Sequence, residues 1–232
     1  DNDTLNFSLA NSDTGFTRLV VSDDVGNTTG DLNYNSDRGS IETALGTGTV
    51  FDFVRWSGGW GTQLQARHVE NWNLLSGSDT NDLRLARGNG TELHGRAGFD
   101  TLYADWSGAS ADIAWDNDPS SAQSINGINL SGMERLILST GSGNDAIDNR
   151  GNGSGSDDIR TGAGNDTVAI DAGSVDTGSG NDTITQSWGG VEAGADNDTL
   201  NFSLANSDTG FTRLVVSDDV GNTTGDLNYT ST

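Results

Sequence analysis

Five short turns that share one residue pattern constrain the fold of this chain more than any other feature. Between residues 141 and 200 the order Gly-x-Gly-x-Asp-x-aliphatic occurs four times, and a fifth turn, at 194–200, differs from it only at the second glycine. The last three turns begin at Gly162, Gly178 and Gly194 and are therefore evenly spaced. Aliphatic residues in the same region follow one another at alternating steps of 9 and 7. This alternation predicts flattened coils of two short strands, stacked about 4.8 Å apart, with one inward aliphatic per strand.

Glycine and aspartate contribute different properties to such a turn. Glycine tolerates positive φ, so that successive carbonyl oxygens can face one space, and aspartate adds a charged oxygen. Calcium takes about six to eight oxygen ligands, which two stacked turns can supply and one cannot. The half-turns from Asp171 to Val175 and from Ser187 to Val191 lack the full motif. We therefore expect the ions mainly along one edge.

The charge of the chain also favours cation binding. Its 34 acidic residues outnumber its 11 basic residues, the net charge is −23, and 29 of the acids are Asp. Stacked aspartates repel one another unless cations lie between them, so folding and calcium binding should be coupled. A polyanion of this kind is not expected to bind nucleic acid or acidic membranes directly. The absence of cysteine excludes disulfides.

The expected calcium ligands extend beyond the regular turns. Asp1 and Asp3 are included because they match Asp196 and Asp198 of the last turn. Weaker upstream turns add three further aspartates. The full predicted set is Gly141, Gly143, Asp145, Gly153, Gly155, Asp157, Gly162, Gly164, Asn165, Asp166, Gly178, Gly180, Asn181, Asp182, Gly194, Asp196, Asp198, Asp1, Asp3, Asp79, Asp82 and Asp100.

These turns resemble the GGxGxDxUx nonapeptides of the RTX, or hemolysin-type calcium-binding, family. The resemblance implies a right-handed parallel β-roll that holds several Ca²⁺ ions, type I secretion, and folding outside the cell. Two features depart from the family pattern: calcium turns do not alternate on both edges, and Asp196 replaces the second glycine of the last turn. The expected fold is thus all-β, an elongated right-handed parallel β-roll or β-solenoid with wider irregular coils between calcium-turn blocks.

A long duplication predicts how the chain is organised. Residues 1–34 recur unchanged as residues 196–229. Gly194 and Ala195 precede the second copy, so Asp1 opens in the middle of a turn. We expect a segment of a longer array whose partners are neighbouring copies of the same repeat, head to tail. One unit spans 1–195, with wider β coils over 1–75, degenerate calcium turns over 76–102, wider β coils with a loop over 103–138 and a regular RTX β-roll over 139–195, and residues 196–232 start the next copy.

The expected function is structural. No nucleophile with an activating base is recognisable, so the chain is not expected to be an enzyme. We expect a secreted or cell-surface repeat of an adhesin or fibril, stiffened by Ca²⁺ and self-assembling into filaments. Lateral self-association or a surface polysaccharide would provide further partners. No apolar run reaches the ~20 residues that a membrane span needs, so no direct membrane insertion is expected.

Two alternatives remain open at this stage. The first is a glycan- or ice-binding module. Trp60 and Trp188, which neighbour glycines, would serve sugar stacking, while the file of Thr167, Thr183 and Thr199 would serve ice. The second is the RTX secretion and folding tail of a secreted enzyme. Trp56, Trp72 and Trp106 lie in alternating patterns and are expected in the core.

Overall fold

The computed structural model describes residues 4–8, 18–20, 35–45, 53–58, 61–67, 71–75, 83–86, 92–95, 97–153, 155–202, 212–214 and 227–229. The chain forms two compact units, residues 1–201 and residues 202–232. In the second unit β18 (Thr212–Leu214) and β19 (Leu227–Tyr229) pair antiparallel. None of the helices among the described residues is long and apolar enough to cross a bilayer.

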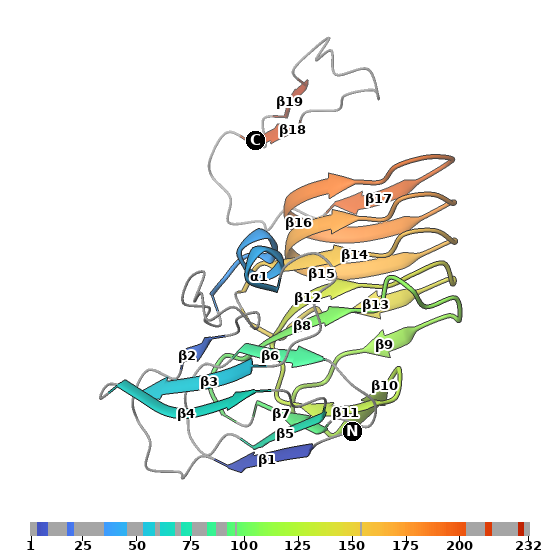
Figure 1. The fold of residues 1–232 in the computed structure, drawn as a ribbon. Helices are drawn as coiled ribbons and strands as arrows, with labels where there is room; N and C mark the ends of the chain where they lie inside the picture. The colour runs from blue at the N-terminus through green and yellow to red at the C-terminus, as the bar shows by residue number, and fades with distance from the viewer. Residues whose placement is uncertain are drawn as a thin grey trace. The chain divides into compact units, whose positions relative to one another are not determined.

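Parallel strands form the largest sheet of the first unit (Figure 1). Its order is β6, β8, β12, β14, β15, β16 and β17, and β13 and β9 extend it from β15. Every defined pair from β6 to β16 is parallel. The strands are β6 (Leu83–Ala86), β8 (Thr101–Asp105), β9 (Ala114–Asp116), β12 (Arg135–Ser139), β13 (Ala146–Asp148), β14 (Asp157–Arg160), β15 (Thr167–Asp176), β16 (Thr183–Glu192) and β17 (Thr199–Phe202).

The pairing register reproduces the spacing of the turns in the sequence. Thr167 of β15 pairs with Thr183 of β16, and the same spacing holds along the whole strand. β15 pairs with β13 through its first three residues and with β14 through Gly173–Asp176. The strands therefore form two rows. The first residues of β15 lie in one row with β13 and β9, and its last residues lie in the other row with β14. Earlier layers are longer. Leu102 pairs with Leu136, and the sequence separation of these two residues is more than twice that of Thr167 and Thr183.

The core contains four of the aliphatic positions that the 9-and-7 spacing predicts. Ile159, Val168, Val175 and Ile184 are all buried to 1% exposure or less. Paired strands put such residues in columns, since Val168 lies in register with Ile147 on one side and Ile184 on the other. Burying a side chain of this size stabilises the fold by roughly 1.5–3 kcal/mol. Each layer depends on its neighbours for that burial.

Tryptophan widens the core where the layers are longer. Trp106 and Trp115 are buried, and their ring centroids lie 6.2 Å apart at an interplanar angle of 44°. Trp106 was expected in the core, and the structure confirms this. The side chains of Trp56, Trp60 and Trp72 lie outside the described part of the chain. Trp188, in contrast, is 76% exposed.

Two smaller sheets complete the strands of the first unit. The five-stranded sheet has the order β1 (Thr4–Ser8), β5 (Asn71–Leu75), β7 (Glu92–His94), β11 (Ile128–Ser131) and β10 (Gln123–Ile125). Its pairs are parallel except for β10 with β11. The three-stranded sheet is antiparallel and consists of β2 (Arg18–Val20), β3 (Phe53–Gly58) and β4 (Gly61–Arg67).

The described structure is mostly β-strand with little helix, and its strands pair mainly in parallel, as the sequence predicted. Two features within residues 1–75 were not predicted. One is the antiparallel sheet of β2, β3 and β4. The other is a helix, α1 (Arg38–Leu45). The loop expected within residues 103–138 lies between β9 and β10 and contains Pro119, and the Ser121 amide there donates to the Asp118 carbonyl.

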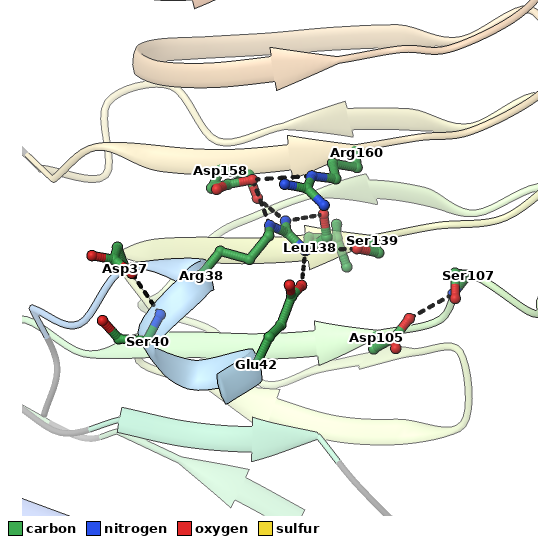
Figure 2. A network of polar contacts seen from close by, with 10 residues as sticks. All are labelled: Asp37, Arg38, Ser40, Glu42, Asp105, Ser107, Leu138, Ser139, Asp158 and Arg160. Carbon is green, nitrogen blue, oxygen red and sulfur yellow. Dashed lines mark hydrogen bonds and ion pairs between the residues drawn. The ribbon is translucent and has the colours of Figure 1, made fainter. Parts of the chain in front are cut away.

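Helix α1 is held on the large sheet by one buried arginine (Figure 2). Arg38 Nε donates to Asp158 Oδ1 at 2.7 Å, and its two terminal nitrogens donate to Ser139 Oγ and to the Leu138 and Asp158 carbonyls. The Arg38 side chain is only 3% exposed. Ile41, one turn later, is fully buried. These contacts between segments far apart in the sequence fix α1 across β12 and β14.

Replacing this arginine should destabilise the first unit. We expect Arg38→Ala to lower the free energy of unfolding by about 3 kcal/mol, because it removes a buried guanidinium and the closest ion-pair partner of Asp158, whose contact with Arg160 is longer. Arg150→Ala is the matched control, since the exposed Arg150 pairs with Asp148 two residues away and its loss should cost less than about 1 kcal/mol. Urea unfolding followed by circular dichroism measures both. Equal losses for the two variants would contradict the assigned role of Arg38.

Candidate functional site

Three of the predicted turns stack directly on one another, at residues 162–166, 178–182 and 194–198. Isolated parallel bridges join Ala163 to Ser179 and Ser179 to Ala195. The Ser179 amide donates to the Gly162 carbonyl at 2.9 Å, and the Gly164 amide donates to the Ser179 carbonyl at 2.9 Å. Figure 1 shows these turns one above another along one edge of the large sheet, in yellow and orange. We call them, with residues 141–145, the motif turns.

Glycine is required in these turns for two reasons. Gly178 and Gly180 have φ values of 84° and 131°, in the region that other residues rarely adopt. In addition, a Cβ atom built on Gly180 would overlap the Gly164 carbonyl oxygen of the turn below. The close approach of the turns and the positive φ both follow from the Gly-x-Gly pattern.

The motif aspartates form a ladder through the interior of this edge. The Asp145 amide donates to Asp166 Oδ1 at 2.8 Å, and the Asp166 amide donates to Asp182 Oδ1 at 2.8 Å. The Asp182 amide continues the ladder to Asp198 Oδ1 at 3.1 Å. Asp145, Asp166 and Asp182 are each 1% exposed, and we call these three the aspartate column.

One oxygen of each carboxylate in the aspartate column is buried without a hydrogen-bond donor. Oδ2 of Asp145, Asp166 and Asp182 has no partner that meets hydrogen-bond geometry. Burial raises the pKa of Asp166, and the neighbouring charges of Asp145 and Asp182 raise it further. The nearby Thr161 hydroxyl opposes that rise. This hydroxyl also reaches the Thr177 carbonyl at 3.4 Å, so its single proton leaves the Asp166 oxygen poorly satisfied.

Two further ladders of hydrogen bonds, one of asparagines and one of threonines, line the same turns. The sequence pattern predicted only Asn165 and Asn181 among their members. Asn144, Asn165 and Asn181 each accept the backbone amide of the Asn one layer later through Oδ1. The asparagines Asn165 and Asn181, expected as metal ligands, thus link adjacent turns on the exposed side. Thr140, Thr161 and Thr177 donate to a carbonyl one layer later. A Thr immediately before the first Gly of three turns was the available sequence signal.

The stack of turns also begins one layer earlier than the sequence pattern predicts. Residues 109–113 stack beneath Gly141 and Gly143, whose added Cβ atoms would overlap the backbone of Ala109 and Ala111. The Ile113 amide donates to Asp145 Oδ1 at 2.8 Å. Trp115 occupies the aliphatic position of this layer, in register with Ile147. The segment carries no glycine pair, so its relation to the motif turns is visible only in the structure.

The last motif turn keeps the geometry despite its irregular sequence. Asp196, which stands where the other turns have glycine, adopts a φ of 87°. A non-glycine residue in this region carries backbone strain of roughly 1–3 kcal/mol. Asp198 is half-buried and accepts the Asp182 amide, so it closes the ladder at the sheet edge. Gly194 stacks on Gly178 as the earlier glycines do.

The turn at residues 153–157 does not join the motif turns. A Cβ added to Gly153 or Gly155 would meet the ring of Phe99, so these glycines accommodate an aromatic side chain. Asp157 begins β14, in the other row of strands, where its Oδ1 accepts the Leu136 amide and Asn149 Nδ2. Burial raises the pKa of Asp157 to about 7, although the two hydrogen bonds and the Arg135 charge oppose the rise.

The remaining predicted ligands are placed as follows. Asp100 is buried at the start of β8, where its carbonyl accepts the Glu134 and Arg135 amides, and it is not in the aspartate column. Asp1, Asp3, Asp79 and Asp82 lie outside the described residues. No group of three or more His, Cys, Asp or Glu side chains capable of holding a metal occurs in the described part of the chain. Each layer contributes a single carboxylate to the column.

Comparison with protein-family models found no match, and neither curated proteins nor solved structures matched this chain.

Proposed function

We propose that this chain is a segment of an extracellular, calcium-binding β-solenoid with a structural role. The proposal rests on one observation: Asp145, Asp166 and Asp182 bury three stacked carboxylates, each with one oxygen that has no hydrogen-bond partner of good geometry. The regular register of β15 with β16 and the two rows of strands support coils of a solenoid, with the handedness and the RTX relationship taken from the resemblance of the turns.

The electrostatics of the aspartate column favour a bound cation. Neighbouring parallel strands lie about 4.8 Å apart, so two adjacent charged carboxylates repel by about 3 kcal/mol at an effective dielectric constant of 20. The column can remove this repulsion only by protonation or by binding cations. Carboxylate oxygens are ligands that calcium prefers, and glycine turns can add backbone carbonyl oxygens. The residues therefore fit calcium, with Asp145, Asp166, Asp182 and Asp198 as the carboxylates that would hold it.

Calcium would act here as a structural charge partner between layers. A chain with a net charge of −23 and a core one aliphatic thick gains stability when cations neutralise its buried carboxylates. Millimolar calcium is characteristic of the extracellular space, which is where such a coupling would permit folding. We therefore propose a non-catalytic repeat of a cell-surface fibre or adhesin.

Calcium titration of a charge-removing variant tests this function. We expect Asp166→Asn to lower calcium affinity on the order of tenfold or more, because it keeps the Oδ1 acceptor for the Asp145 amide but removes a charge. Asp176→Asn is the matched control, since Asp176 is exposed on the other row of strands and should bind calcium like the wild type. Isothermal calorimetry measures affinity, and thermal unfolding with and without chelator measures coupling. A wild-type chain whose unfolding is unchanged by chelator would refute the proposal.

A second candidate function, glycan binding, is favoured by Trp188. Its side chain is 76% exposed on β16, and the two residues that follow it, at 189 and 190, are glycines without side chains. Exposed aromatic rings of this kind can stack on the apolar face of a sugar. Loss of polysaccharide binding in Trp188→Ala, with unchanged calcium binding, would support this function in addition to the structural one.

A further inference from the structure

The last strand of the large sheet lacks the burial that its position in the stack predicts. Leu200 follows Val168 and Ile184 at the same spacing, and the Thr199 amide donates to the Asp182 carbonyl as the earlier layers do. Val168 and Ile184 are fully buried, whereas Leu200 is 47% exposed. β17 is an end strand of its sheet, paired on one side with β16. Among the described residues, no further layer of the sheet covers Leu200 on the other side.

The same sequence has a different neighbour at the start of the chain. Residues 4–7 and 199–202 both read Thr-Leu-Asn-Phe, within the two identical segments 1–34 and 196–229. β1 is the end strand of the five-stranded sheet, and it pairs in parallel with β5. In that register Leu5 lies opposite Trp72 and Phe7 lies opposite Leu74. One copy of the strand therefore pairs with β16 and the other copy pairs with β5.

We propose that this strand is a junction strand, which lies between β16 of one copy of the chain and β5 of the next. A single strand has two edges, and the two copies show one neighbour each. Placing both neighbours on one strand joins the large sheet of one copy to the five-stranded sheet of its partner. The partner's β5 then covers the layer that contains Leu200. This inference rests on the proposed head-to-tail stacking and not on calcium.

Each copy of the strand already covers one sheet edge within the same chain. β1 occupies the edge of β5, and β17 occupies the edge of β16, so two chains can join only if one copy is displaced. Exposed strand edges associate readily with other strands, and a displaced copy leaves such an edge. Weakening either copy should therefore promote joining, while weakening both copies should prevent it.

Proline substitutions in the full chain, at saturating calcium, test this logic. Proline removes a backbone donor and is poorly tolerated where a strand has neighbours on both edges. The matched variants are Leu5→Pro and Leu200→Pro, which make the same change at identical positions of the two segments. We expect each single variant to associate on the order of tenfold more tightly than the wild type, measured by sedimentation velocity. The double variant should remain monomeric.

The double variant makes the experiment decisive. If exposed edges alone caused association, the double variant would associate at least as strongly as either single variant, and the proposal would be overturned. Monomeric single variants that retain the wild-type circular dichroism spectrum would also overturn it. The calcium proposal is tested separately by chelation of the wild type, so either proposal can fail without the other.

Cysteine cross-linking determines the register of the junction, because the chain has no native cysteine. Asn201 matches Asn6, which lies opposite Asn73 in the pairing of β1 with β5. In the Leu5→Pro background, Asn73→Cys with Asn201→Cys should give a ladder of disulfide-linked chains on a non-reducing gel. Leu74→Cys with Asn201→Cys places one thiol out of register on the opposite face and should not form the ladder. Equal ladders from both pairs would overturn the assigned register.

Discussion

In calcium-free buffer the chain should be more stable at pH 4 than at pH 8, by on the order of 4 kcal/mol from Asp157 alone. Asp157 is 5% exposed, and burial raises its pKa from 3.8 to about 7. In the unfolded chain the same carboxyl group titrates near 3.8. A difference of roughly three pKa units corresponds to about 4 kcal/mol. Asp166, whose pKa is also raised, adds to the effect in the same direction.

The direction follows from the protons that each state binds. Below about pH 4 both states hold the Asp157 proton, and folding incurs no penalty from this group. Between about pH 4 and pH 7 the unfolded chain loses its proton first, so the folded chain binds more protons and stability falls as the pH rises. Above about pH 8 both states are ionised and the loss is complete. Calcium should leave this part of the pH dependence in place, because Asp157 lies outside the aspartate column.

Asp157→Asn isolates the contribution of this residue from the general repulsion of a chain with a net charge of −23. Asparagine keeps an oxygen that can accept the Leu136 amide and Asn149 Nδ2, but it has no charge to bury. We expect the variant to be more stable than the wild type at pH 8 and similar at pH 4, by urea unfolding in chelator. Asp176→Asn should follow the wild type at both pH values. A variant that is destabilised equally at both values would show that the Asp157 charge is not the cause.

The sequence predicted the repeating layers because their periodicity depends on local residue types. The aliphatic spacing from Ile159 to Ile184 and the Gly-x-Gly-x-Asp order each repeat over a short stretch of chain, and both appear in the structure at the period that the sequence shows. The motif aspartates were predicted for the same reason. The pattern could not show their hydrogen bonding. One oxygen of Asp166 accepts an amide from the preceding layer, and the other oxygen has no hydrogen-bond partner of good geometry.

Features that depend on distant contacts were missed. Helix α1 is fixed by Arg38 on strands that follow much later in the chain, and nothing in its local sequence indicates that partner. The turn at Gly153 has the residue pattern of a motif turn, but Phe99, far earlier in the chain, lies against it. The layer at residues 109–113 joins the stack without the glycine pattern, because the glycines that the close approach requires are Gly141 and Gly143 of the next layer. In each case tertiary packing decided the outcome that a local motif left open.

Gly180→Ala should destabilise the first unit by roughly 2–6 kcal/mol, a large loss for a single added methyl group. Two independent penalties combine at this position. A φ of 131° is strained for any residue with a Cβ atom, at a cost of roughly 1–3 kcal/mol. The new Cβ would also overlap the Gly164 carbonyl oxygen, a backbone atom that cannot move without separating two stacked turns. Overpacking in protein cores typically costs about 1–3 kcal/mol, and we expect a similar further cost here.

Gly190→Ala provides the control that separates this clash from the general loss of a glycine. Gly190 lies on β16 with nothing within 4 Å of an added Cβ atom, and its φ is not positive. Alanine there should be neutral or stabilising by a few tenths of a kcal/mol, because it reduces the entropy of the unfolded chain. Urea unfolding in saturating calcium compares the two variants. If the turns separate to hold an ion, the overlap at Gly180 is relieved and only the strain from its φ remains, so the measured loss should fall to about 1–3 kcal/mol. The size of the loss in calcium therefore reports how closely the calcium-bound turns are stacked.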